Sequence, residues 1–203
     1  MPSRNRSSRA RPSSPPSGRT KRLPSSRGIQ ALFLDVDGVL TDGRLYMDDR
    51  GRELKVFDTK DGHGIKMALA AGLKVAWISG RTSLATTRRA KDLGVRFCYQ
   101  GVQDKLARYE ALCRRWGLGP EETAVIGDDE PDVPMLKAAG FSACPADATA
   151  PARRAARVVL EHPGGRGAVR EFVERVLALN DFGASAPASP SPRPPSERKG
   201  KKP

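Results

Sequence analysis

The feature that most constrains the fold of this chain is the alternation of short apolar runs with amphipathic segments across residues 29–183. Runs such as "IQALFLD" (29–35) and "LKVAWIS" (73–79) are typical of strands buried on both faces, and helical periodicity follows the strand-like runs along the chain. "RLYM" and "ELKVFD", separated by "DDRGR", predict a small β-hairpin near residues 44–57. Repeated strand–helix units predict an α/β fold, namely a Rossmann-like parallel sheet covered by helices.

Charge and composition divide the chain into three parts. Residues 1–28 carry eight Lys/Arg and no acid, and residues 184–203 carry five Lys/Arg and one Glu. Most of the formal net charge of +13 therefore lies in these tails, and residues 29–183 are left nearly neutral. Both tails are rich in Ser, Pro and basic residues and poor in apolar ones, which predicts disorder. We expect one domain between a basic tail and a Pro/Ser/Lys tail.

The composition also argues against two classes of partner. A nearly neutral domain does not favour binding to nucleic acid, and no aromatic residue lies among the basic residues of either tail. The amino terminus lacks the apolar region of a secretory signal, and no apolar run approaches the ~20 residues of a membrane span. Cys98, Cys113 and Cys144 show no metal or redox spacing, so we expect reduced thiols in a cytoplasmic protein.

Polar residues follow four of the predicted strands. They are Asp35 and Asp37 after the first strand, Ser79 after the second, Lys105 after "VRFCYQ", and Asp128, Asp129 and Asp132 after "TAVIG". Because the carboxyl ends of parallel strands meet at one edge of a sheet, we expect these side chains to converge there.

The residue types at this edge favour phosphoryl transfer. Three or more carboxylates cannot share a site without a cation, and oxygen ligands without His or Cys indicate Mg²⁺. A lysine and a serine hydroxyl beside that ion supply donors for an anionic group. We expect Asp35 to attack phosphorus and form an aspartyl-phosphate. We expect Asp37 to protonate the leaving oxygen and then to activate water.

Several motifs also carry a family resemblance. "DVDGVLTDG", "ISGR", "QGVQDK" and "GDDEPD", in this order, resemble the four motifs of the haloacid dehalogenase superfamily. "LTDGRLYMDDRGRELKVFDTKDGHGIKMA" and "GGRGAVREFVE" are similar to the 3-deoxy-D-manno-octulosonate 8-phosphate phosphatase family, across about residues 29–180. The resemblance implies a Mg²⁺-dependent homotetrameric phosphatase. Its substrate would be a phosphorylated eight-carbon ulosonic acid used in lipopolysaccharide synthesis.

The same resemblance implies a phosphatase without a cap domain. Only about forty residues separate Asp37 from Ser79, and one helix separates Lys105 from Asp128. Neither gap holds a further domain, so we expect neighbouring subunits to cover the open site. The hairpin near residues 44–57 exposes strand edges and is the expected subunit contact, with Val56 and Phe57 in it.

The resemblance implies a role for each matching residue. Asp35 corresponds to the nucleophile, Asp37 to the acid/base, and Ser79 and Lys105 to the residues that hold the phosphate. The implied Mg²⁺ ligands are Asp35, Asp37 through its backbone carbonyl, and Asp128. The implied substrate-binding residues are Asp37, Asp58, Thr59, Lys60, Asp61, Gly62, Lys66, Arg81, Arg89 and Lys105.

Three alternatives remain open at this point. The chain could be a phosphatase of a nine-carbon ulosonate 9-phosphate, since relatives act on such acids. It could be a non-catalytic tetrameric assembly domain with the same fold, although a scaffold has no need of Asp35, Asp37, Lys105 and Asp128 together. It could also bind nucleic acid through its tails.

Overall fold

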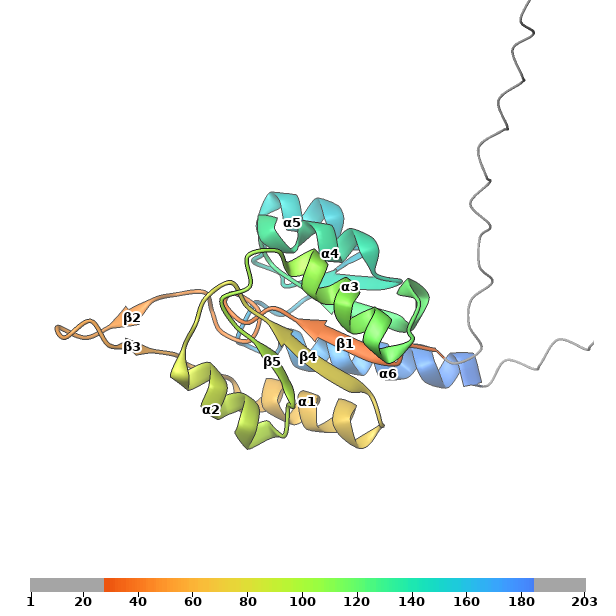
Figure 1. Cartoon of the computed structure of the whole chain (residues 1–203), viewed down its shortest axis with the longest axis horizontal. Helices are drawn as coiled ribbons and strands as arrows, with labels where there is room; N and C mark the ends of the chain where they lie inside the picture. Colours follow the sequence, from red (N-terminus) through yellow and green to blue (C-terminus); the bar gives the residue numbers. More distant parts are fainter. Residues whose placement is uncertain (1–27, 185–203) are drawn as a thin grey trace, which may run out of the picture.

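A six-stranded parallel sheet forms the centre of the protein (Figure 1), in a computed structural model that describes residues 28–184. The strands lie in the order β5-β4-β1-β6-β7-β8 and all pair in parallel. Their bounds are β1 Ala31–Leu34, β4 Lys74–Ile78, β5 Phe97–Tyr99, β6 Thr123–Ile126, β7 Phe141–Cys144 and β8 Val158–Val159. The α/β prediction is therefore confirmed. The two predicted tails lie outside the described residues, apart from Gly28 and Ala184.

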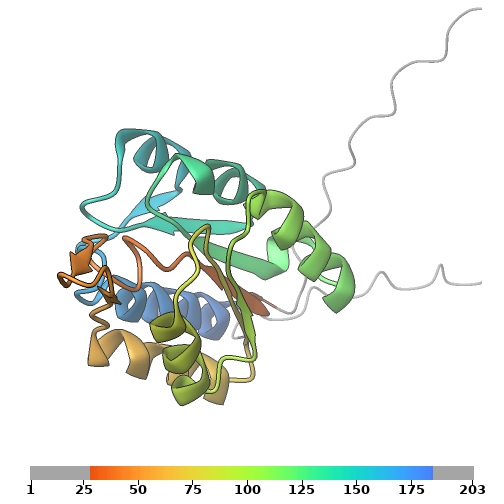
Figure 2. The same ribbon diagram turned by 60° about the vertical axis from the view of Figure 1, so that its left-hand side comes forward.

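Helices cover both faces of this sheet. One face carries α1 (Thr59–Ala70), α2 (Leu84–Leu93) and α6 (Ala168–Ala184), and the other carries α3 (Lys105–Trp116), α4 (Val133–Ala138) and α5 (Ala150–Ala155). Two short 3₁₀ helices, η1 (Pro120–Glu122) and η2 (Glu130–Asp132), precede and follow β6 along the chain. Helices α1 and α6 lie side by side in both views (Figure 2).

The central strand shows why the sheet needs both layers. All four residues of β1 are buried, and they alternate between two cores. Leu32 and Leu34 pack toward α1 and α6, whereas Ala31 and Phe33 pack toward α3 and α4. Burial of the larger side chains among them, those of Leu32, Phe33 and Leu34, contributes roughly 1.5–3 kcal/mol each. The continuous apolar run predicted this burial on both faces.

A hairpin leaves the main body between β1 and α1. Its strands β2 (Tyr46–Met47) and β3 (Glu53–Leu54) pair antiparallel as a separate two-stranded sheet (Figure 1). Only this hairpin, α1 and β4 lie between Asp37 and Ser79, and only α3, η1 and β6 lie between Lys105 and Asp128. The predictions of a hairpin insertion and of no cap domain are therefore confirmed.

The two ends of the described chain meet at the amino edge of the sheet. The backbone N–H of Ile29 donates to Asn180 Oδ1 at 2.7 Å, and Asn180 Nδ2 donates to the carbonyl of Ile29 at 2.9 Å. Helix α6 is thereby fixed to the start of β1, at the edge opposite the carboxyl ends of the strands. Within residues 28–184, no helix combines the length and apolar character that a membrane crossing requires.

Candidate active site

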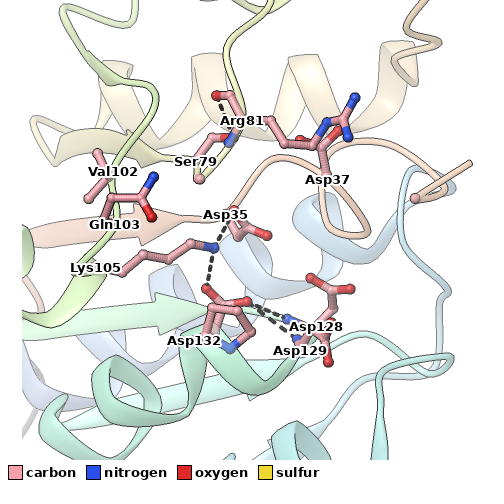
Figure 3. Close-up of a pocket in the computed structure, with 13 residues that line it drawn as sticks. Asp35, Asp37, Ser79, Arg81, Val102, Gln103, Lys105, Asp128, Asp129 and Asp132 are labelled. Atoms are coloured by element: carbon pink, nitrogen blue, oxygen red, sulfur yellow. Dashed lines mark hydrogen bonds and ion pairs between the residues drawn. The ribbon is translucent and has the colours of Figure 1, made fainter. Parts of the chain in front are cut away.

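The predicted polar residues converge on one cavity at the carboxyl edge of the sheet (Figure 3). Asp35 directly follows β1, Ser79 directly follows β4, and Lys105 begins α3 after the cap residue Asp104. The cavity has a volume of about 410 Å³. Its lining includes Asp35, Asp37, Ser79, Arg81, Lys105, Asp128, Asp129 and Asp132. The residues that the sequence placed just after the predicted strands therefore do meet at one edge of the sheet.

A buried lysine lies between two carboxylates at the bottom of this cavity. Lys105 Nζ lies 2.8 Å from Asp35 Oδ1 and 2.7 Å from Asp132 Oδ1. Burial and the charge of Asp132 raise the pKa of Asp35 well above its ordinary value, and the ammonium of Lys105 opposes that shift. Burial acts to lower the pKa of Lys105, but the two carboxylates outweigh it and raise this pKa. Lys105 is therefore held as a cation.

Asp132 orients the site instead of remaining free for a ligand. One of its oxygens accepts the hydrogen bond from Lys105. The other accepts the backbone N–H groups of Asp128 and Asp129, at 3.2 and 3.3 Å. Because both oxygens are engaged, Asp132 fixes Lys105 and the turn that carries Asp128.

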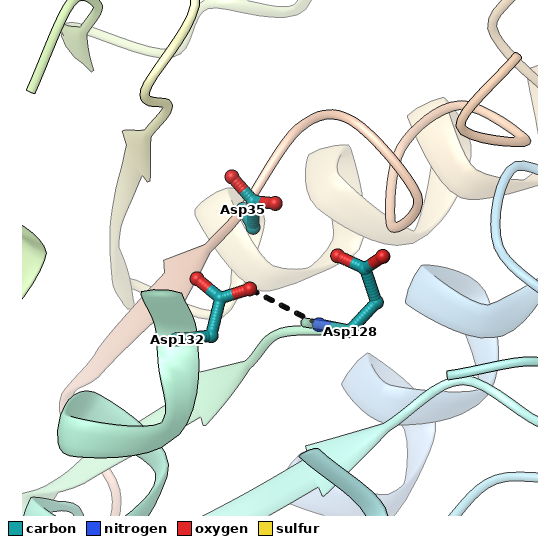
Figure 4. Close-up of side chains that lie close together, drawn as sticks. All are labelled: Asp35, Asp128 and Asp132. Atoms are coloured by element: carbon teal, nitrogen blue, oxygen red, sulfur yellow. Dashed lines mark hydrogen bonds between the residues drawn. The ribbon is translucent and has the colours of Figure 1, made fainter. Parts of the chain in front are cut away.

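Asp132 nevertheless belongs to a cluster of three carboxylates, of which Asp35 and Asp128 are the two suited to hold a hard divalent cation (Figure 4). Asp35, Asp128 and Asp132 each present an oxygen, and these atoms lie within 4.8 Å of one another. Asp128 Oδ1 is buried and has no hydrogen-bond partner among residues 28–184. Burial, followed by the charge of Asp132, raises the pKa of Asp128 to about 7. A buried acceptor without a donor beside a second carboxylate is suited to Mg²⁺.

Glycines allow the loop that carries Asp37 to lie close to these groups. Gly38 has φ +87°, and a Cβ atom there would overlap the carboxylate of Asp128. From the other side, the N–H of Gly165 donates to the carbonyl of Val39 at 2.9 Å. A Cβ atom at Gly164 would overlap the carbonyl of Gly38. The loop after β1 is thus packed between Asp128 and a glycine loop that precedes α6.

Ser79 is held at the cavity wall by the backbone of Arg81. The N–H of Arg81 donates to Ser79 Oγ at 3.1 Å, and Ser79 Oγ donates to the carbonyl of Arg81 at 3.2 Å. The Arg81 guanidinium extends to Glu53 of the hairpin, with Nη2 3.0 Å from Oε1. Arg81 is therefore the point at which the hairpin meets the part of the cavity wall that carries Ser79.

The structure adds Lys55, which sequence reasoning missed. Lys55 Nζ donates a hydrogen bond to Asp37 and lies 3.6 Å from Glu53 Oε1. The Lys55 side chain is only 4% exposed, although it belongs to the projecting hairpin. The alternation of charged and apolar residues in "RELKVF" was the available signal, since it predicts that Glu53 and Lys55 share one side.

Most of the predicted substrate loop lies away from this cavity. Asp58 caps α1 by accepting the N–H of Lys60 at 2.6 Å. A second cavity of about 230 Å³ lies between α1 and α2, and its lining includes Thr59, Gly62, His63, Lys66 and Arg89. Of the predicted substrate residues, only Asp37, Arg81 and Lys105 line the first cavity.

The structure places Asp61 in a contact between α1 and the start of α6. Its carboxylate is buried and accepts the N–H of Arg170 at 2.8 Å and that of Gly167 at 3.1 Å. Burial raises the pKa of Asp61, and these backbone donors oppose the shift. Asp61 therefore joins α1 to the start of α6 and is not exposed to a substrate.

Comparison with known proteins gives a consistent set of relatives. Residues 99–172 match the family model described as haloacid dehalogenase-like hydrolase. The chain is 40% identical over 155 residues to 3-deoxy-D-manno-octulosonate 8-phosphate phosphatase KdsC of Escherichia coli strain K12. That alignment covers 76% of this chain and 82% of the relative.

Solved structures extend the similarity to the fold. The 3-deoxy-D-manno-octulosonate 8-phosphate phosphatase of Yersinia pestis superposes with a TM-score of 0.74 at 39% identity, covering 79% of this chain and 86% of that one. The enzyme of the same name from Moraxella catarrhalis was solved with magnesium, phosphate and KDO. It gives a TM-score of 0.74 at 36% identity, covering 78% and 92% of the two chains.

Proposed function

This chain belongs to the 3-deoxy-D-manno-octulosonate 8-phosphate phosphatase family of haloacid dehalogenase-like hydrolases, and we propose that it hydrolyses that sugar acid phosphate to the free acid and phosphate. Identity of 40% across 82% of a relative of that name carries the proposal. The cavity at the carboxyl edge supports it, because a carboxylate, a cation and a hydroxyl line the same cavity. The reaction belongs to lipopolysaccharide precursor synthesis.

Asp35 is the proposed nucleophile. Its carboxylate attacks phosphorus and the bond to the leaving oxygen breaks, which gives an aspartyl-phosphate. Lys105 keeps this buried carboxylate in place and offers positive charge to the transferring group. Ser79 lines the same cavity, and its hydroxyl would turn away from the carbonyl of Arg81 to donate to a phosphoryl oxygen.

The residues that would hold Mg²⁺ are Asp35, Asp128 and the backbone carbonyl of Asp37. Bound there, the ion supplies positive charge that offsets the charge of the phosphoryl oxygens. The unpaired oxygen of Asp128 supports this assignment, as does the magnesium in the Moraxella relative. Asp132 stays outside the ligand set because Lys105 and backbone donors engage both of its oxygens.

Asp37 is the proposed acid/base. It lines the cavity with a side chain that is 24% exposed, where a leaving group can exit. Its carboxyl group gives a proton to the leaving alkoxide, and the carboxylate then takes a proton from the water that attacks the aspartyl-phosphate. Hydrolysis restores Asp35 and releases phosphate.

We further propose a cytoplasmic homotetramer assembled through the hairpin. The hairpin presents Leu54 and Val56 to solvent, at 67% and 61% exposure, which supports contact with another subunit. The cavity between α1 and α2 carries Lys66 and Arg89, which suit the carboxylate of a sugar acid in a neighbouring subunit's site. Cys98, Cys113 and Cys144 are free thiols, which supports a reducing compartment.

Phosphate release from a panel of ulosonate phosphates tests the proposed function. With Mg²⁺, kcat/KM should be highest for the eight-carbon 8-phosphate. A higher value for a nine-carbon 9-phosphate would move the protein to that substrate class. No release from any member, by a folded and Mg²⁺-loaded protein, would leave the non-catalytic assembly domain as the better description.

A further inference from the structure

We propose that Lys55 is a positioning residue for the acid/base Asp37, and that the hairpin thereby sets the geometry of proton transfer to the leaving group. The inference rests on the proposed phosphatase function. Lys55 Nζ donates a hydrogen bond to Asp37 Oδ1, although 18 positions separate the two residues in sequence. Asp37 lies on the loop after β1, and Lys55 directly follows β3.

The orientation of side chains along the hairpin is the reverse of that in an ordinary surface strand. Leu54 and Val56 face solvent at 67% and 61% exposure, whereas the Lys55 side chain is 4% exposed and that of Glu53 is 19% exposed. Successive side chains of an extended segment point to opposite sides. The charged side of this segment therefore faces the catalytic cavity, and the apolar side faces away from it.

Charged partners continue from Lys55 to the opposite wall of the cavity. Lys55 Nζ lies 3.6 Å from Glu53 Oε1, and Arg81 Nη2 lies 3.0 Å from that same oxygen. Arg81 holds Ser79 through its backbone. Asp37, Lys55, Glu53 and Arg81 thus connect the loop after β1 to the loop after β4 through the hairpin.

The chemistry of the reaction explains why such a support matters. A general acid must stand within hydrogen-bond reach of the leaving oxygen, and a partly exposed aspartate on a loop has several side-chain orientations. An ammonium donates up to three hydrogen bonds, so Lys55 can hold Asp37 while Glu53 holds Lys55. Lys55 bonds to Oδ1 of Asp37, so we assign the other oxygen, Oδ2, to the leaving group.

Two substrates that differ in leaving group test this role. A nitrophenolate leaves with little need of a proton, whereas the alkoxide of a sugar phosphate requires one. The test therefore compares kcat for p-nitrophenyl phosphate with kcat for the alkyl phosphate that the wild-type protein hydrolyses fastest. Lys55→Met should lower kcat for the alkyl phosphate at least about 10-fold more than kcat for p-nitrophenyl phosphate, since general acid catalysis is worth about 10²–10⁴-fold.

Further variants separate positioning from stability. Lys55→Arg keeps a cation and should recover most of the alkyl phosphate rate. Glu53→Gln leaves Lys55 in place but weakens its second partner, and should show the same selective loss at about 2–5-fold. Arg52→Met is the matched control, because Arg52 lies on the same hairpin and pairs with Asp48 near its turn. It should leave the ratio of the two kcat values unchanged.

The proposal would be overturned if Lys55→Met lowered kcat equally for both substrates and Glu53→Gln kept the wild-type ratio of the two kcat values. It would also be overturned if Lys55→Met lowered kcat for neither substrate. The wild-type rates judge the proposed function, whereas the change in the substrate ratio between variants judges the role of Lys55. The comparison of the two kcat values can be made with whichever alkyl phosphate the wild-type protein hydrolyses fastest. A wrong sugar assignment therefore leaves the test of Lys55 intact.

Discussion

Lys105 Nζ lies 2.8 Å from the carboxylate of Asp35, and both side chains are buried. A lysine buried on its own would lose its proton, and an aspartate buried on its own would gain one. Each instead supports the charge of the other, with Asp132 as a second anion beside the lysine. Lys105, which comes from a different strand–helix unit, thus partly offsets the rise in the pKa of Asp35 that burial and Asp132 cause.

Removal of this cation should damage both folding and catalysis. Lys105→Met leaves Asp35 and Asp132 buried without their shared donor, so we expect the free energy of unfolding to fall by about 3–5 kcal/mol. Chemical denaturation of the metal-free protein measures that loss. Lys137→Met, a change in α4 outside the cavity lining, is the control. A loss below about 1 kcal/mol in the free energy of unfolding would show that Lys105 is not needed to hold the two buried carboxylates.

Asp35→Asn should abolish turnover while the protein stays folded. The amide keeps the shape of the side chain but removes the nucleophilic oxygen and one negative charge of the proposed cation site. We expect phosphate release to fall by at least about 10³-fold, measured with saturating Mg²⁺. Asp48→Asn, at the exposed turn of the hairpin, should retain the wild-type rate. Wild-type turnover by Asp35→Asn would refute the aspartyl-phosphate mechanism.

The stabilising effect of Mg²⁺ should grow with pH. Burial raises the pKa of Asp128 from 3.8 to about 7, so the protonated carboxyl favours the metal-free fold. This stability is fully present below the unfolded value of 3.8 and is lost as pH rises through about 7. Mg²⁺ binds the ionised form and offsets the loss.

Thermal unfolding with and without Mg²⁺ measures this dependence. The increase in Tm should be larger at about pH 8 than at about pH 6. Asp128→Asn should remove most of the increase at both values, because the ligand no longer ionises. An increase that is equal at both pH values in the wild-type protein would show that the ion does not bind at Asp128.

Asp61 should matter for stability more than for substrate binding. Asp61→Ala leaves the N–H groups of Gly167 and Arg170 buried without an acceptor, at a cost of about 1–3 kcal/mol. KM should stay within about twofold of wild type, because the carboxylate of Asp61 is buried and engaged by backbone donors of α6. Glu174→Ala, on the exposed side of α6, should cost less than about 0.5 kcal/mol. A raised KM with unchanged stability would restore Asp61 to the substrate site.

Charged residues on the outer side of the hairpin should disrupt the proposed tetramer. Leu54→Glu combined with Val56→Glu places two carboxylates where an apolar contact is proposed. Sedimentation should show smaller species, and KM for the sugar acid phosphate should rise by about 10-fold or more. Leu84→Glu, at a residue 75% exposed on α2, is the control. A folded monomer with unchanged kcat/KM would contradict the coupling of assembly and recognition.

The order of strands and helices was predictable because it depends on local patterns. Apolar runs marked the strands, and residues such as Asp35 and Ser79 follow those runs directly. The start of α1 was harder to predict from the sequence. Gly62 and Gly64 disfavour a helix in this stretch, yet α1 begins at Thr59 after the cap Asp58. A Cβ atom on Gly64 would lie 3.0 Å from Arg170 Cα, so the helix keeps glycine there to approach α6.

The contacts that sequence reasoning missed join distant parts of the chain. Asp61 bonds to residues 106 and 109 positions away, and no local pattern records such a pairing. Phe57 was grouped with Val56 at the subunit contact, but its ring stacks on Trp77 with centroids 6.5 Å apart. Adjacent residues of an extended segment face opposite ways, and only the tertiary structure shows which of them faces the domain.

Asn180 joins the last helix to the first strand at the amino edge of the sheet, opposite the catalytic cavity. The two ends of the described domain therefore lie together and away from the cavity at the carboxyl edge. A fusion partner or surface joined directly at Ile29 or Asn180 would therefore start at the edge of the sheet opposite that cavity. Since the ends are adjacent, the domain is also suited to circular permutation, with new termini opened in a surface turn such as the one between α2 and β5.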